Sequence, residues 1–141
     1  MIIVLFGQPT SGKSTLANYI VKTSSNFINV DGDNLRNLFQ DKDYSKEGRI
    51  KNLNRASDIA IYLNSVDYDV VLSLVYPYKE ARDYLNNLCN NVKWVYLTYD
   101  GERERDSYHV KDFEVPGYNE NVLVLNTSKL SIQECINKMF P

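Results

Sequence analysis

The stretch GQPTSGKS, residues 7–14, has the form G-x-x-x-x-G-K-S and directly follows the apolar run IIVLF, residues 2–6. The apolar run predicts a buried strand. After the stretch, apolar residues recur at helical intervals, at Leu16, Ala17, Ile20 and Val21. A phosphate-binding loop requires this strand before it and this helix after it, whereas a chance match in a glycine-containing loop requires neither. The sequence therefore predicts a phosphate-binding loop (P-loop), and this motif decides the fold class.

The residue types of the P-loop suit the phosphates of a nucleoside triphosphate. Gly7 and Gly12 allow backbone angles that turn successive N–H groups inward, and the following helix adds the positive end of its dipole. We expect Lys13 to reach the β- and γ-phosphates and the Ser14 hydroxyl to bind Mg²⁺. The residues predicted to bind ATP here are Gly7, Thr10, Ser11, Gly12, Lys13, Ser14 and Thr15.

Size, charge and cysteine content narrow the class of protein. The length of 141 residues predicts a single domain, residues 1–141. The formal net charge of −2 argues against a broad basic face, so we expect no binding to nucleic acid or to a membrane surface. Cys89 and Cys135 match no metal-binding spacing and are interpreted as reduced thiols of a cytoplasmic protein, with a disulfide as the alternative. The opening apolar run is too short for a signal peptide or a membrane span.

Strand and helix signals alternate along the chain, which is typical of a parallel sheet covered on both faces. The predicted strands are 2–6, 27–30, 70–75, 94–97 and 122–125. Ser131 and Glu134 form a capping box at the start of the final helix, and Trp94 is assigned to the core. We expect an α/β protein with three layers, in which helices cover both faces of a five-stranded parallel sheet.

The turn Asp31-Gly32-Asp33 directly follows the second predicted strand. Ligands of open α/β sheets bind outside the carboxyl ends of the strands, so this turn should face the P-loop across a crevice. Phosphoryl transfer to an alcohol needs metal charge on the phosphates and a group that orients or deprotonates the hydroxyl, and two carboxylates suit these tasks. The alternative is a helix N-cap, in which Asp31 or Asp33 accepts backbone N–H bonds. The nearby P-loop favours Asp31 and Asp33 as catalytic residues together with Lys13.

A third group of residues is rich in arginine and comprises Arg36, Arg49, Asn52 and Arg55. The last three are spaced three residues apart, so a helix can place them along one side of the crevice. Arginine holds phosphate or sulfate oxygens in a bidentate fork, which suits a wall that binds the phosphoryl acceptor. For Arg55, a solvated helix face is an equal alternative.

In combination, these motifs resemble the adenylylsulfate kinases. The likeness comprises the P-loop, Asp-Gly-Asp-Asn-Leu-Arg at 31–36, Tyr-Ser at 44–45 and the Arg-x-x-Asn-x-x-Arg helix at 49–55, and it continues at 73–82 and 113–116. It therefore covers nearly the whole chain. That family transfers the γ-phosphoryl group of ATP to the ribose 3′-hydroxyl of adenosine 5′-phosphosulfate. Gluconate kinases share the P-loop and a similar Asp-Gly-Asp turn but lack this arginine and asparagine helix.

The resemblance implies a role for each matching residue. Lys13, Ser14 and Thr15 would bind ATP and magnesium, with Asp31 beside the metal. Asp33 would hold or deprotonate the acceptor hydroxyl. The residues implied to contact or flank the acceptor are Asp33, Arg36, Arg49, Asn52, Val75 and Tyr76. The resemblance also implies the three-layer P-loop kinase fold, with the strands of its parallel sheet in the order 2-3-1-4-5, and a homodimer.

Two departures from the family pattern fall on the acceptor side. The family's Ile-Ser-Pro is Val-Tyr-Pro at 75–77, and its Phe-Ser is Tyr-Ser at 44–45. Most of the basic lid that follows the Arg-Asp pair at 105–106 is absent. In the family that lid helps to cover both nucleotides and supplies a ring that stacks on the acceptor base. We therefore expect weaker water exclusion or a different contact with the base.

Several nearby side chains are candidates to compensate for the missing lid. Tyr76, Tyr78 or Tyr108 could supply a stacking ring, and the alternative for each is an amphipathic position at the rim. The charged run at 102–106 is interpreted as a solvated helical turn, with Arg105 over the ATP base as the alternative. His109 is interpreted as an exposed loop residue, with a bond to a phosphate as the alternative.

Three function hypotheses remain open. The first is an ATP:alcohol phosphotransferase of adenylylsulfate kinase type, acting in sulfate assimilation on a nucleotide-like small molecule. The second keeps the chemistry with another acceptor, such as cytidine diphosphoramidate in capsule biosynthesis. The third is a nucleotide-binding relative without turnover, and the joint retention of the expected site residues argues against it. These residues are Lys13, Ser14, Asp31, Asp33, Arg36, Arg49 and Asn52.

Overall fold

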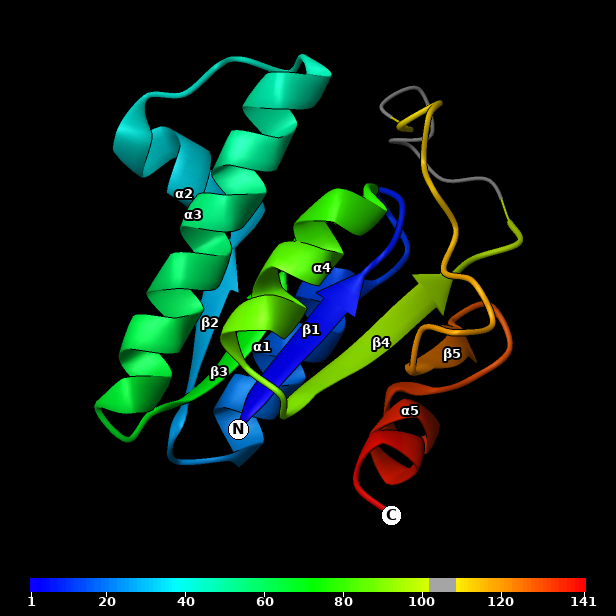
Figure 1. Ribbon diagram of the computed structural model, residues 1–141. Helices are drawn as coiled ribbons and strands as arrows, with labels where there is room; N and C mark the ends of the chain where they lie inside the picture. The colour runs from blue at the N-terminus through cyan, green and yellow to red at the C-terminus, as the bar shows by residue number, and fades with distance from the viewer. Residues whose placement is uncertain (102–108) are drawn as a thin grey trace.

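A parallel sheet lies at the centre of the protein (Figure 1). The computed structural model describes residues 1–101 and 109–141, and within these ranges it has five strands. They are β1 (Ile2–Phe6), β2 (Phe27–Asp31), β3 (Asp69–Ser73), β4 (Val92–Thr98) and β5 (Val122–Asn126). The order is β2-β3-β1-β4-β5, and neighbouring strands are parallel. The predicted sheet and its strand order are confirmed.

Helices cover both faces of this sheet (Figure 1). They are α1 (Lys13–Thr23), α2 (Gly32–Phe39), α3 (Lys46–Ser65), α4 (Lys79–Leu88) and α5 (Ile132–Met139). Successive side chains of a strand point to opposite faces, so β1 contributes to two cores. Ile2, Val4 and Phe6 pack with α3 and α4, and Ile3 and Leu5 pack with α1 and α5. The predicted three-layer α/β architecture is confirmed.

The local predictions were correct for the final helix and for the core tryptophan. Ser131 Oγ accepts a hydrogen bond from the Glu134 N–H, and Glu134 Oε1 accepts one from the Ser131 N–H, which completes the capping box. Trp94 is buried in the layer that contains α3 and α4. Cys89 and Cys135 form no disulfide. No helix within the described ranges is long and apolar enough to cross a membrane.

The third strand ends earlier than predicted. The apolar run suggested a strand to residue 75, but β3 ends at Ser73. The chain turns after this residue, and Tyr76 has a φ of 45°, which is incompatible with extended backbone. An apolar run thus reports burial, and here it includes a turn as well as a strand.

Candidate functional site

A cleft of about 1050 Å³ opens at the carboxyl ends of β1, β2 and β3. The P-loop forms one side, and residues of α2 and α3 form the other. This is the edge where ligands bind in open α/β sheets. The residues expected from sequence to form the site that do line it are Thr10, Gly12, Lys13, Ser14, Thr15, Asp31, Asp33, Arg36, Arg49, Asn52 and Val75. The fold therefore brings together motifs that lie up to 65 residues apart, from Thr10 to Val75.

The P-loop is shaped by its two glycines and by its lysine. Gly7 and Gly12 have φ values of +144° and +100°, which L side chains rarely adopt. Lys13 Nζ donates to the carbonyl oxygens of Gly7 at 3.0 Å and of Gln8 at 2.9 Å, so the ammonium lies over the loop. Gly7 and Ser11 are themselves buried and do not line the cleft. These two buried residues form the inner side of the loop, away from the cleft.

Replacing Gly7 with alanine should destabilise the loop and weaken nucleotide binding. A Cβ atom at Gly7 would lie 2.3 Å from the Leu97 carbonyl oxygen, and the φ value of +144° adds strain of about 1–3 kcal/mol. Thermal unfolding and titration with a fluorescent ATP analogue measure both effects. Gly117→Ala is the matched control, because Gly117 is exposed and its added Cβ meets only Asn119 Oδ1 at 3.3 Å. Equal unfolding temperatures for the two variants would contradict the prediction.

Asp31 and Asp33 lie opposite the P-loop at the start of α2. Asp31 is the N-cap residue, and its carboxylate accepts a hydrogen bond from the Asn34 N–H at 3.2 Å. Asp33 lies in the first turn of the helix. Both residues also line the cleft. The structure thus shows the predicted N-cap for Asp31 while leaving further carboxylate lone pairs for a ligand, so the two interpretations are compatible.

Oxygen atoms of the cleft fit the ligand preference of Mg²⁺. The Ser14 hydroxyl and the carboxylates of Asp31 and Asp33 line the same cleft, and hard oxygen ligands are those that Mg²⁺ takes. Among the described residues, no group of three or more His, Cys, Asp or Glu side chains forms a metal cage. Mg²⁺ in nucleotide sites is usually held by one or two carboxylates together with phosphates and water, so the donor set fits that type of site.

Arg36 is held at the cleft by the loop that joins α2 to α3. Its guanidinium donates to the Asp43 carbonyl oxygen at 3.0 Å and lies 3.6 Å from the Asp41 carboxylate. It also lies over the Tyr44 ring, 4.1 Å from the centroid. The hydrogen bond from the Asp43 N–H, reinforced by Arg36 and Arg55, keeps the pKa of Asp41 below its usual value despite some desolvation. The cationic group is therefore fixed in place before any ligand binds.

Tyr44 is a cleft residue for which no binding role was predicted. Its side chain is exposed and lines the cleft beside Arg36. The sequence showed an aromatic residue next to the Ser45 N-cap of α3, and that position was the available signal. An exposed ring stacked on a fixed guanidinium offers a flat surface to a ligand ring.

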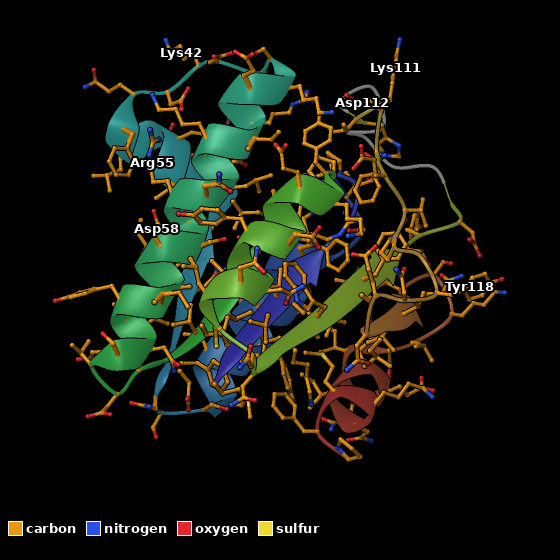
Figure 2. All side chains as sticks on the ribbon, viewed as in Figure 1. Lys42, Arg55, Asp58, Lys111, Asp112 and Tyr118 are labelled. Carbon is orange, nitrogen blue, oxygen red and sulfur yellow. The ribbon has the colours of Figure 1, made fainter. Side chains whose placement is uncertain are left out.

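Arg55 lies neither in the cleft nor on a solvated helix face, the two alternatives that the sequence left open. Successive residues of an α-helix are offset by about 100° around the helix axis. Asn52 is therefore offset by about 60° from Arg49, and Arg55 by about 120°. Arg55 instead contacts the region of α2, where its guanidinium pairs with Asp41 at 3.4 Å and lies 4.1 Å from the Phe39 ring centroid (Figure 2). Its role is to pack the two helices together.

Asn52 is unusual among the cleft residues because its amide oxygen has no partner. The side chain is 4% exposed, and Oδ1 is buried without a hydrogen bond to any described residue. A buried polar atom without a partner is costly in a folded protein. Asn52 thus contributes to the wall of the cleft while its amide oxygen lies buried behind the surface of that wall.

Tyr76 and Tyr78 are neither stacking rings nor rim residues, which corrects both interpretations. Their side chains are 0% and 1% exposed. The Tyr76 hydroxyl lies 2.9 Å from Ser57 Oγ in the core, and the Tyr78 hydroxyl donates to the Asp112 carboxylate at 3.0 Å. Tyr76 therefore cannot offer its side chain to an acceptor, although Val75 and Pro77 on either side of it line the cleft. The predictions for Arg105 and Tyr108 concern residues outside the described ranges.

His109 and Val110, which are distant in sequence from the P-loop, close the edge of the cleft beside it. Gln8 Nε2 donates to the Val110 carbonyl oxygen, and Gln8 Oε1 accepts from the Val110 N–H, both at 2.8 Å. This clamp holds Val110 and its exposed neighbour His109 at the cleft. Gln8 occupies a variable position of the motif, so the sequence pattern contained no signal for its contact.

Comparisons with known proteins support a common origin for fold and motifs. The family model for adenylylsulphate kinase matches residues 1–108. The chain is 30% identical over 94 residues to the adenylyl-sulfate kinase of Pseudomonas entomophila, covering 63% of this chain and 45% of that protein. It is 28% identical over 103 residues to the cytidine diphosphoramidate kinase of Campylobacter jejuni, covering 70% of this chain and 61% of that protein. The matched region spans about half the length of the curated adenylyl-sulfate kinases.

A solved structure is similar in fold over almost the whole chain. It is the APS kinase of Mycobacterium tuberculosis in complex with AMPPNP and APS, with a TM-score of 0.78 and 21% sequence identity. The alignment covers 97% of this chain and 93% of that one. The layers and the sheet order described above are therefore those of P-loop kinases.

Proposed function

Because the chain belongs to the adenylylsulphate kinase family, we propose that it transfers the γ-phosphoryl group of ATP to a hydroxyl group of a nucleotide-like acceptor. The ribose 3′-hydroxyl of adenosine 5′-phosphosulfate is the first candidate. The proposal rests on one observation. The P-loop, the Asp31 and Asp33 carboxylates and a cationic wall formed by Arg36 and Arg49 line a single cleft. A donor phosphate and an anionic acceptor can therefore meet in it.

On the donor side, the P-loop backbone and Lys13 would bind the triphosphate. The Lys13 ammonium now bonds two backbone carbonyls of the loop, and phosphate oxygens are stronger acceptors for it. Ser14 and Asp31 would hold Mg²⁺, which when bound supplies positive charge to the phosphate oxygens. This set of contacts neutralises the charge that moves during transfer.

On the acceptor side, Asp33 would orient the attacking hydroxyl and take its proton. The hydroxyl oxygen forms a bond to the γ-phosphorus, the bond from that phosphorus to the bridging oxygen breaks, and ADP leaves with the electron pair. Arg36 and Arg49 would bind the acceptor's sulfate or phosphate oxygens. Asn52, which lines the same wall, would contact the acceptor beside them.

Cytidine diphosphoramidate is the second candidate acceptor. The relative from Campylobacter jejuni matches a larger share of this chain than the adenylyl-sulfate kinase from Pseudomonas entomophila does. The turn at residues 75–77 also departs from the adenylylsulfate kinase pattern, and its central tyrosine points away from the cleft. An altered acceptor wall supports a changed acceptor with unchanged transfer chemistry.

A panel of acceptors tests the proposal. ADP formation is measured with ATP and Mg²⁺ in the presence of adenosine 5′-phosphosulfate, cytidine diphosphoramidate, AMP or gluconate. We expect acceptor-dependent ADP with one of the first two compounds and none with gluconate, because gluconate has no nucleotide for the cationic wall and Tyr44 to bind. ADP formation with gluconate alone would assign a sugar kinase. Tight ATP binding without turnover for any acceptor would support a non-catalytic relative.

A further inference from the structure

The turn after β3 connects the two halves of the cleft. The Val75 carbonyl oxygen accepts a hydrogen bond at 3.2 Å from the N–H of Gly7, the first residue of the P-loop. Val75 and Pro77 line the cleft. Tyr76 lies between them and is fully buried. The backbone of this turn therefore contacts the donor half, while its central side chain enters the core beneath the acceptor half.

The Tyr76 side chain is bonded to α3, the helix of the acceptor wall. Its hydroxyl lies 2.9 Å from Ser57 Oγ and donates to the Leu53 carbonyl oxygen at 3.4 Å. Its ring packs edge-on against Trp94, with centroids 5.5 Å apart. A buried hydroxyl without partners would be costly, so these bonds hold the turn and the helix at one separation.

The backbone of Tyr76 is strained and is restrained by a second contact. Its φ of 45° lies in a region that bulky residues rarely occupy. Arg82 Nη1, from α4, donates to the Tyr76 carbonyl oxygen at 2.9 Å. A strained backbone conformation persists where several surrounding contacts hold it in place, and such conformations are common at functional sites. Here both the side chain and the carbonyl are held.

We propose that Tyr76 is a positioning residue that sets the separation between the P-loop and the acceptor wall of α3. The inference rests on the proposed function. Arg49 and Asn52 lie on α3, one to two turns before Ser57. Their distance from the P-loop decides whether the acceptor hydroxyl lies in line with the γ-phosphate, and an error of about 1 Å in such alignment can reduce the rate about 100-fold.

Kinetics of a hydroxyl deletion test this role. Tyr76→Phe keeps the ring and its packing but removes the bonds to α3. We expect kcat/KM for the acceptor to fall about 10-fold or more, with the KM for ATP unchanged. Ser57→Ala should lower the same parameter, and the double variant should be no worse than Tyr76→Phe, because the bond that Ser57→Ala removes is one of the two that Tyr76→Phe already removes.

Tyr84→Phe is the matched control. The Tyr84 hydroxyl also bonds α3, donating to Asp58 Oδ1 at 2.7 Å, but it is an exposed contact and does not line the cleft. Its removal should leave all kinetic parameters at the wild-type values. An acceptor kcat/KM that is unchanged in Tyr76→Phe, or equally reduced in both variants, overturns the inference.

Hydrogen–deuterium exchange decides the inference independently of turnover. In the protein without substrates, Tyr76→Phe should speed amide exchange in the first half of α3, residues 46–57, while Tyr84→Phe should not. Unchanged exchange in Tyr76→Phe overturns the proposed tie between the turn and α3. If the wild-type protein phosphorylates no acceptor of the panel, the proposed function fails, and the exchange comparison still decides whether Tyr76 holds α3 in place.

Discussion

Replacing Asp33 with asparagine should reduce acceptor-dependent ADP formation by about 10²–10⁴-fold while leaving ATP binding nearly intact. Asp33 lies in the first turn of α2 and lines the cleft opposite the P-loop. Asparagine has the same shape but cannot take a proton from the acceptor hydroxyl. Steady-state ADP formation and equilibrium binding of a fluorescent ATP analogue measure the two effects separately.

The control for this variant is Asp83→Asn. Asp83 is an exposed carboxylate on α4 that pairs with Lys79, and it does not line the cleft. Its substitution should leave both measurements unchanged. A wild-type rate in Asp33→Asn would remove Asp33 from catalysis, and a parallel loss of ATP binding would assign it to the donor side.

Replacing Arg82 with leucine should destabilise the protein by about 3–5 kcal/mol, because it removes every hydrogen bond of a buried guanidinium and leaves the partly buried Glu120 carboxylate without its cation. The Arg82 side chain is 1% exposed. It donates to both carboxylate oxygens of Glu120, at 2.9 and 3.3 Å, and to the carbonyl oxygens of Tyr76 and Glu114, both at 2.9 Å. Urea unfolding gives the change in free energy.

An exposed ion pair on the same helix is the control for this loss. Lys79 and Asp83 lie 2.7 Å apart, and both side chains are about half exposed. Lys79→Leu should change the free energy of unfolding by less than about 1 kcal/mol, because solvent screens such pairs. Equal changes in the free energy of unfolding for Arg82→Leu and Lys79→Leu would show that the burial of the Arg82 contacts does not add to stability.

The stabilisation by Arg82 should also depend on pH. Burial alone would raise the pKa of Glu120, but hydrogen bonds from Arg82 and from the Gly117 N–H outweigh it and hold that pKa below its usual value. A carboxyl pKa that is lower in the folded state stabilises the fold above the unfolded-state pKa, and the contribution is lost as pH falls through the folded-state pKa. The difference in stability between wild type and Arg82→Leu should therefore shrink in acid. A difference independent of pH would contradict this.

Prediction from the sequence succeeded where the signal was local. The P-loop lies between the predicted strand, Ile2–Phe6, and a helix that contains the residues of the predicted helical spacing, and the Asp31 turn begins α2. It failed where a short pattern was read across a turn or around a helix. The apolar run to residue 75 extended past the end of β3 at Ser73. Two steps of three residues place Arg55 about 120° from Arg49 around the helix axis, where it contacts Phe39 instead of the cleft.

The sequence by itself determined the P-loop, the strands of the sheet and the presence of carboxylates and arginines suited to two anionic substrates. Those features depend on periodicity and on the few residue types that tolerate special backbone angles, so a short window of sequence contains them. Only the tertiary structure decided that Tyr76 enters the core, that Tyr44 lies on the cleft, and that Gln8 clamps Val110. Burial in the core selects the position of Tyr76, whereas Gln8 and Val110 are 102 residues apart, so no short window of sequence contains their hydrogen bonds.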